Sequence, residues 1–105
     1  MQRLYAQIRV DETKLRYYAA CPQCGARRYA GKLPASCPRT LLPELAAGTA
    51  EPRRQRAYHR GARIAARRLA RYFNRCRLCA QWVCDACYDV EDDLGACRQC
   101  STQFR

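Results

Sequence analysis

Apolar residues occupy every second position over residues 4–10, and polar residues fill most of the positions between them. This period of two predicts a β-strand. Residues 15–20 are predicted to form a returning strand, and residues 27–32 a third. A turn of sequence Cys-Pro-Gln-Cys-Gly separates the second and third strands, and residues 34–39 are predicted to be a loop.

The longest helical pattern begins at Pro52, a residue that suits the first turn of a helix, and continues to Phe73. A shorter helical turn over residues 41–47 is expected to stop at Gly48. One face of the long helix is apolar and is predicted to pack in the core; it carries Tyr58, Ala62, Ala65, Leu69, Tyr72 and Phe73. A second stripe is basic and consists of Arg56, Arg60, Arg63, Arg67 and Arg71.

The composition is poor in core-forming side chains. Leu, Ile, Val and Phe make up 16 of the 105 residues, and the formal net charge is +11. Such a balance is typical of disordered chains, because too little apolar surface is buried to offset the loss of chain entropy. A source of order other than hydrophobic burial is therefore expected, and the nine cysteines are the candidates.

Eight of the cysteines form four pairs with the same spacing: Cys21 and Cys24, Cys76 and Cys79, Cys84 and Cys87, Cys97 and Cys100. A two-residue gap lets one tight turn direct two thiolates at a single Zn²⁺ ion. The first ten residues lack the apolar run of a signal peptide, and no stretch is long and apolar enough to cross a membrane. We therefore expect a cytoplasmic protein with metal ligands rather than disulfides, and two structural zinc ions.

The spacing between the pairs favours an interleaved arrangement. Only four residues separate Cys79 from Cys84, which makes one ion shared by neighbouring pairs difficult. The first predicted zinc site is Cys21, Cys24, Cys84 and Cys87. The second is Cys76, Cys79, Cys97 and Cys100. A sequential arrangement of the pairs remains an alternative.

Two other uses of these residues fit the sequence less well. A redox Cys-x-x-Cys motif would require a βαβ pattern, and none is seen. Cys37 and His59 are compatible with a three-Cys, one-His site with Cys21 and Cys24, but that would leave later cysteines without a place. We expect instead that Cys37 is a spare loop thiol and that His59 is a solvent-facing helical residue.

The segment from Arg75 to Cys100, with Cys21 and Cys24 as a first pair, resembles FYVE-type zinc fingers and related treble-clef domains with cross-brace ligation. The resemblance implies the same interleaved zinc ligation. It does not extend to phosphoinositide binding, because the basic motif with adjacent histidines and the Trp-x-x-Asp motif of FYVE domains are missing. RING ligases are a more distant likeness, since they usually use a histidine ligand.

The sequence thus predicts a small α+β, zinc-stabilised domain over residues 1–105 with short β-hairpins and one long basic helix. Its parts are N-terminal strands with the first zinc knuckle (1–36), a loop (37–51), the arginine-rich helix (52–75) and three further knuckles (76–105). We expect no enzymatic activity, because closed four-thiolate sites leave no open metal position.

Between Pro52 and Cys84 there are ten arginines and no acidic residue, which indicates an anionic partner. A protein partner is expected first, with RNA or DNA binding through residues 52–77 as the alternative and a phosphoinositide membrane disfavoured. Eight thiolates and two Zn²⁺ ions would lower the net charge to about +7. Five acids near the last knuckles are also expected to cover part of the helix: Asp85, Asp89, Glu91, Asp92 and Asp93.

Overall fold

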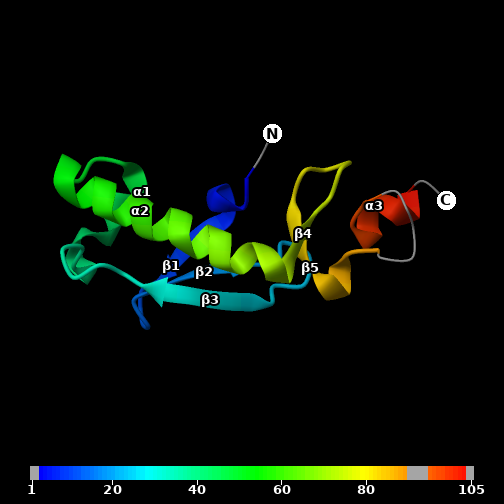
Figure 1. The fold of residues 1–105 in the computed structure, drawn as a ribbon, viewed down its shortest axis with the longest axis horizontal. Coiled ribbons are helices and arrows are strands. Elements are labelled where there is room, and N and C mark those ends of the chain that lie inside the picture. The colour runs from blue at the N-terminus through cyan, green and yellow to red at the C-terminus, as the bar shows by residue number, and fades with distance from the viewer. Residues whose placement is uncertain (1–2, 90–94, 104–105) are drawn as a thin grey trace.

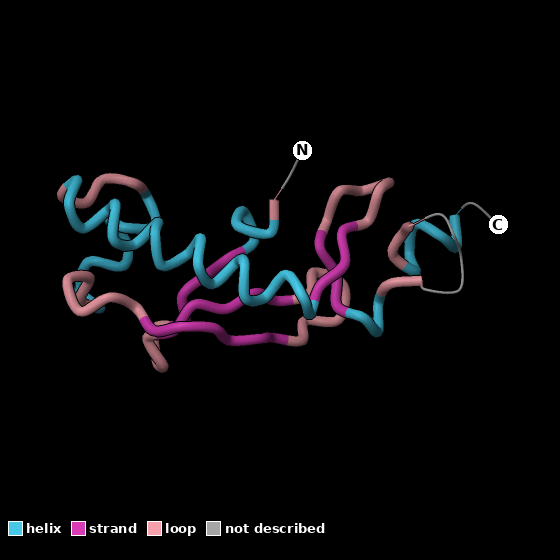
Figure 2. The backbone as a smooth tube through the Cα atoms, in the orientation of Figure 1, coloured by secondary structure: helices cyan, strands magenta, loops and turns pink. Residues whose placement is uncertain are grey.

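The computed structural model describes residues 3–89 and 95–103. The described chain is a small α+β structure with two antiparallel sheets (Figure 1). The long helix lies along the three-stranded sheet, and the two-stranded sheet with the C-terminal helix forms the far end of the molecule. Figure 2 shows the same path of the backbone with its helices, strands and loops in different colours.

The N-terminal strand is shorter than the alternating pattern predicted. Residues Leu4–Gln7 form a 3-10 turn, η1, and strand β1 covers only Ile8–Asp11. The prediction was wrong here because Leu4 and Ile8, both buried, are four residues apart, and that spacing places them on one side in a strand or in a helical turn. The turn also brings the side chain of Gln7 to the backbone of Trp82.

The three-stranded sheet has the order β1-β2-β3, with β2 at Arg16–Ala20 and β3 at Arg27–Lys32. Tyr17 is buried and its hydroxyl donates a hydrogen bond of 2.8 Å to the carbonyl oxygen of Tyr58 in the long helix. Tyr17 therefore faces the helix. Tyr18, the next residue, points to the opposite face, and it pairs in register with Tyr29 of β3.

Two helices follow the sheet. Helix α1, Leu42–Ala47, ends as predicted at Gly48, whose φ of +81° is the left-handed conformation that favours glycine. A 3-10 turn, η2 at Arg39–Leu41, precedes it. Helix α2 covers Pro52–Leu69. None of the described helices is both long and apolar enough to span a lipid bilayer.

The long helix ends earlier than Phe73, where the sequence placed its end. A 3-10 turn, η3 at Ala70–Tyr72, leads into strand β4 at Phe73–Arg75. The chain leaves the helical path because β4 must pair with β5 at Trp82–Cys84. As a result Phe73 is buried, whereas Tyr72, which was expected in the core, is 37% exposed.

After β5, the far end of the molecule (the distal end) contains a 3-10 turn, η4 at Asp85–Cys87, and a short helix, α3 at Arg98–Gln103. The sequence did not predict α3. The predicted acidic cover over α2 is only partly within the described residues. Asp85 accepts a hydrogen bond from Asn74, and Asp89 accepts one from Ser101. Glu91, Asp92 and Asp93 lie outside the described residues.

The main core lies between α2 and the three-stranded sheet and extends into the distal end. Its buried residues include three of the paired cysteines, Cys21, Cys76 and Cys97, and a small number of large side chains: Leu4, Ile8, Tyr17, Leu69, Phe73 and Val83. The core is therefore continuous with the cysteine groups, and the cysteines contribute to packing as well as to any metal they bind.

Candidate metal centres

The structure gathers the eight paired cysteines into two groups of four. Within each group the sulfur atoms lie within 4.8 Å of one another. The first group joins the turn after β2 to the end of β5 and the η4 turn that follows it, and contains Cys21, Cys24, Cys84 and Cys87. The second joins the β4–β5 turn to the start of α3, and contains Cys76, Cys79, Cys97 and Cys100. This is the interleaved composition expected from the spacing.

The first turn of each group has the same backbone hydrogen bonds. The N–H of Cys21 donates to the carbonyl of Ala26 at 2.8 Å, and that of Gly25 to the carbonyl of Cys21 at 2.8 Å. In the second group the N–H of Cys76 donates to Gln81, and that of Ala80 to Cys76, each at 2.9 Å. Both turns therefore hold their two cysteines in one arrangement, although their sequences differ.

The sulfur positions suit a tetrahedral zinc ion. Zn–S bonds of about 2.3 Å place the sulfurs of a tetrahedron about 3.8 Å apart. The sulfurs of Cys24 and Cys84 are 3.5 Å apart, and those of Cys79 and Cys97 are 3.9 Å apart. All nine cysteines are described and none forms a disulfide. Each group can therefore hold one metal ion with four thiolates, the ligand set typical of structural zinc.

Backbone N–H groups point at the first sulfur of the later pairs. Those of Leu78 and Cys79 donate to the sulfur of Cys76 at 3.4 Å, and that of Cys100 donates to the sulfur of Cys97 at 3.5 Å. Such bonds stabilise a thiolate and fix its direction.

One thiol in each group is easily ionised. Burial opposes ionisation of Cys21 and Cys76, but backbone N–H donors outweigh it and lower the pKa of each to about 6. In contrast, burial and bonds to neighbouring sulfurs raise the pKa of Cys87 to about 12, and bonds to Cys97 and then burial do the same for Cys100. Each group thus offers one ready thiolate, and a cation that binds displaces the protons of the others.

Cys37 and His59 are outside both groups, and neither has the environment that the sequence suggested. Cys37 is buried with Leu42 and Leu45 in a second small core, and its thiol donates to the carbonyl of Arg54 at 3.4 Å. It is a packed residue rather than a spare loop thiol. This burial depends on how α1 folds back on α2, which no local pattern indicates.

His59 is half-buried rather than solvent-facing. The amide of Gln55 donates to the carbonyl of Leu45 at 2.7 Å, and its oxygen accepts from the N–H of Ala50. The same amide nitrogen lies 3.1 Å from Nε2 of His59, which must therefore accept. The proton of the neutral ring is then on Nδ1, which donates to the hydroxyl of Tyr5.

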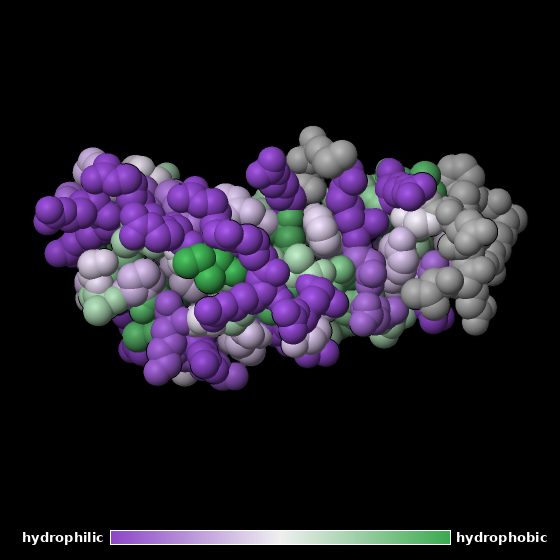
Figure 3. Space-filling model, viewed as in Figure 1, coloured by the Kyte–Doolittle hydropathy of each residue, from purple (hydrophilic) through white to green (hydrophobic). Residues whose placement is uncertain are grey.

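The predicted arginine stripe is exposed on α2 and η3: Arg56, Arg60, Arg63, Arg67 and Arg71. Figure 3 shows hydrophilic side chains gathered along this helix. Comparison with protein-family models, with curated proteins and with solved structures finds no match to this chain. The arrangement of its own residues is therefore the basis for assigning a function.

Proposed function

We propose that the chain is a non-catalytic interaction module held together by two structural zinc ions in a cross-brace, treble-clef-like arrangement. The two groups of four sulfurs support this proposal, because four thiolates complete the tetrahedron of zinc and leave no position for a substrate. Zinc-bound thiolates also suit a reducing compartment such as the cytoplasm.

The binding surface in this proposal is the arginine stripe of α2. The observation that carries it is that, in the part of the chain that the structure describes, the arginines of the stripe form no ion pair with a carboxylate. Within the described residues, the ion pairs of arginine are Arg54 with Glu51 and Arg27 with Asp11. Arg60, Arg63 and Arg67 have no carboxylate partner in that part of the chain. Like charges one helical turn apart repel each other and destabilise the free helix. Binding of an anionic partner reduces this repulsion.

Two partner classes fit the stripe, an acidic protein surface and a nucleic acid. The protein surface is the first expectation from sequence. The specific observation in favour of nucleic acid is the exposure of Tyr72 beside the arginines, since a base can stack on an aromatic ring and a carboxylate cannot. We therefore favour nucleic acid as the anionic partner.

Charge reversal on the helix tests the surface. Arg63→Glu/Arg67→Glu is compared with Arg16→Glu/Arg39→Glu, which makes the same change of net charge at exposed residues outside α2. Both are measured by elution from immobilised heparin, with zinc content checked by native mass spectrometry. We expect the stripe variant to elute at clearly lower salt than the control. Equal elution of the two variants would refute the assignment of the surface to α2.

A further inference from the structure

Three tyrosines around strand β3 each carry a stacked cation. The guanidinium of Arg28 lies 4.1 Å from the ring centroid of Tyr72, and that of Arg27 lies 4.4 Å from the ring of Tyr18. The Tyr29 ring is stacked with the ammonium group of Lys14 at 4.3 Å. The two guanidinium stacks present flat, positively charged surfaces on which further planar groups can stack.

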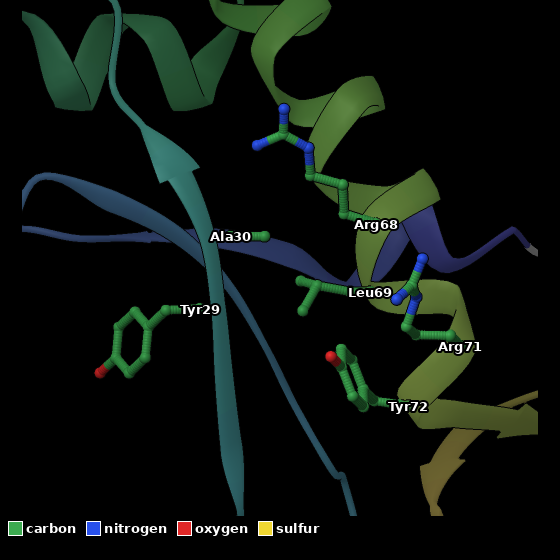
Figure 4. A pocket seen from close by; sticks show the side chains of 6 residues that line it. All are labelled: Tyr29, Ala30, Arg68, Leu69, Arg71 and Tyr72. Carbon is green, nitrogen blue, oxygen red and sulfur yellow. The ribbon is translucent and has the colours of Figure 1, made fainter.

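One of these stacks borders a cleft between β3 and the end of α2. The cleft has a volume of about 400 Å³, within the range of small-ligand sites. Its lining residues are Tyr29, Ala30, Arg68, Leu69, Arg71 and Tyr72. In Figure 4, Leu69 and Ala30 point toward each other across the cleft, Arg68 and Arg71 come from the helix side, and Tyr72 stands below Leu69.

The chemistry of the lining indicates what the cleft can hold. Leu69 is buried and Ala30 is half-buried, so the floor is apolar. Arg68 and Arg71 are exposed at the rim, and no carboxylate is among the lining residues. An apolar floor, a ring at one wall and two guanidinium groups suit a ligand that is planar at one end and anionic at the other.

We infer that this cleft binds one nucleotide of a single-stranded nucleic acid. The base stacks on the Tyr72–Arg28 pair over the Leu69 floor, while Arg68 and Arg71 contact the flanking phosphates. A single strand is required because the bases of a duplex are stacked on one another and do not reach a side-chain ring. This inference rests on the proposed function, since it places the anionic partner at the end of the same helix.

The open face of the three-stranded sheet is a weaker candidate than the cleft for binding a nucleotide. Tyr18 and Tyr29 lie there with ring centroids 5.6 Å apart, and the hydroxyl of Tyr29 donates to Asp11 at 2.9 Å. The backbone N–H of Lys14 and the Tyr29 hydroxyl hold the pKa of the Asp11 carboxyl below its usual range, and this carboxylate is ion-paired with Arg27 at 3.5 Å. The cation stacked on Tyr18 is therefore already paired with a carboxylate, and it is less available to a phosphate than Arg68 and Arg71 are.

The test uses the zinc-loaded full chain and a fluorescent oligouridylate of about 12 nucleotides, a length that covers a small binding surface. Tyr72→Leu removes the ring and keeps an apolar side chain. We expect it to weaken oligouridylate binding about tenfold, the usual effect of losing one stacked base. Binding of an RNA duplex of the same length is expected to stay unchanged, because it depends on charge alone.

The second variant, Arg68→Gln/Arg71→Gln, removes the two proposed phosphate contacts. We expect the slope of log affinity against log salt for oligouridylate to fall by about 1.4. The matched control, Arg16→Gln/Arg39→Gln, changes net charge equally outside α2 and should leave the slope nearly as in the wild type. Zinc content and far-UV circular dichroism establish that each variant is folded.

Three outcomes overturn the inference. Tyr72→Leu with wild-type affinity for oligouridylate excludes the stack, and equal slopes for the two arginine pairs exclude the phosphate contacts. Competition by polyglutamate as strong as by oligouridylate, at equal charge, assigns the surface to an acidic protein instead. Each of these leaves the arginine stripe as the binding surface if Arg63→Glu/Arg67→Glu still releases the chain from heparin. Loss of that effect refutes the stripe as the surface, and with it the proposed function.

Discussion

At the scale of single residues, the two equivalent turns differ in one conformationally important position. Gly25 follows the second cysteine of the first turn with φ of +78°, and Ala80 occupies the same place in the second turn with φ of +63°. Positive φ suits glycine, whereas for alanine it costs about 1–2 kcal/mol. The second turn therefore contains strain that the first does not.

Exchanging these residues should have opposite effects on stability. Ala80→Gly relieves the strain at a smaller cost in chain entropy, so we expect the free energy of unfolding to rise by about 0.5–1 kcal/mol. Gly25→Ala should lower it by about 1 kcal/mol, and since nothing lies within 4 Å of the added Cβ, only the backbone conformation is tested. Urea unfolding of the zinc-loaded variants measures both, and changes of the same sign would contradict the argument.

The residue scale also shows what the sequence was able to predict. The grouping of the cysteines followed from the lengths of the gaps between pairs, because short loops limit which sulfurs can meet. Gly48 and Gly25 marked the ends of α1 and of the first turn, because positive φ favours glycine locally. In contrast, the exposure of Tyr72 and the burial of Cys37 depend on contacts between elements, and no local signal predicts them.

At the scale of elements, the side chain of Gln7 connects η1, next to the three-stranded sheet, to strand β5 of the two-stranded sheet. The amide of Gln7 donates to the carbonyl of Trp82 at 3.0 Å and accepts from the N–H of the same residue at 2.9 Å. The amide therefore makes the two hydrogen bonds that the backbone of a neighbouring strand would make with Trp82 of β5. The sequence indicated strand alternation at Gln7 and gave no sign of this contact, because its partner is 75 residues away.

Gln7→Leu should therefore weaken the junction between η1 and β5. Two hydrogen bonds are lost and part of the polar backbone of Trp82 is covered by an apolar side chain, so we expect the free energy of unfolding to fall by about 2 kcal/mol. The fluorescence of Trp82, the single tryptophan of the chain, reports unfolding at this position.

Gln81→Leu is the matched control for that change. Gln81 is exposed, adjoins Trp82, and within the described residues its side-chain amide makes no hydrogen bond. Its substitution is expected to shift stability by less than about 0.5 kcal/mol. If both variants unfold at the same urea concentration, the Gln7 contact does not hold the junction.

At the scale of the whole molecule, the fold is long and narrow. Its principal extents are 49, 24 and 19 Å, and its radius of gyration is 15.4 Å, whereas a compact domain of this length has about 13 Å. An elongated body shares few contacts between its ends, so hydrophobic burial alone connects them weakly. The first cysteine group links the end of β2 to the end of β5 and the turn after it, so a zinc ion there connects the three-stranded sheet to the far end of the molecule.

Removal of zinc should therefore unfold the chain as a whole rather than loosen one end. Structural zinc contributes about 10–16 kcal/mol of apparent binding free energy, as much as the entire stability of a typical small domain at about 5–15 kcal/mol. Treatment with EDTA is expected to abolish the helical signal of α2 in far-UV circular dichroism, although none of its residues is a ligand. Cys84→Ser should lose the ion of the first group and most of the helical signal, while Cys37→Ala, which alters a buried cysteine outside both groups, should keep two zinc ions in native mass spectrometry. A helical apo protein would mean that the core between α2 and the sheet is sufficient by itself, and that zinc orders only the distal end.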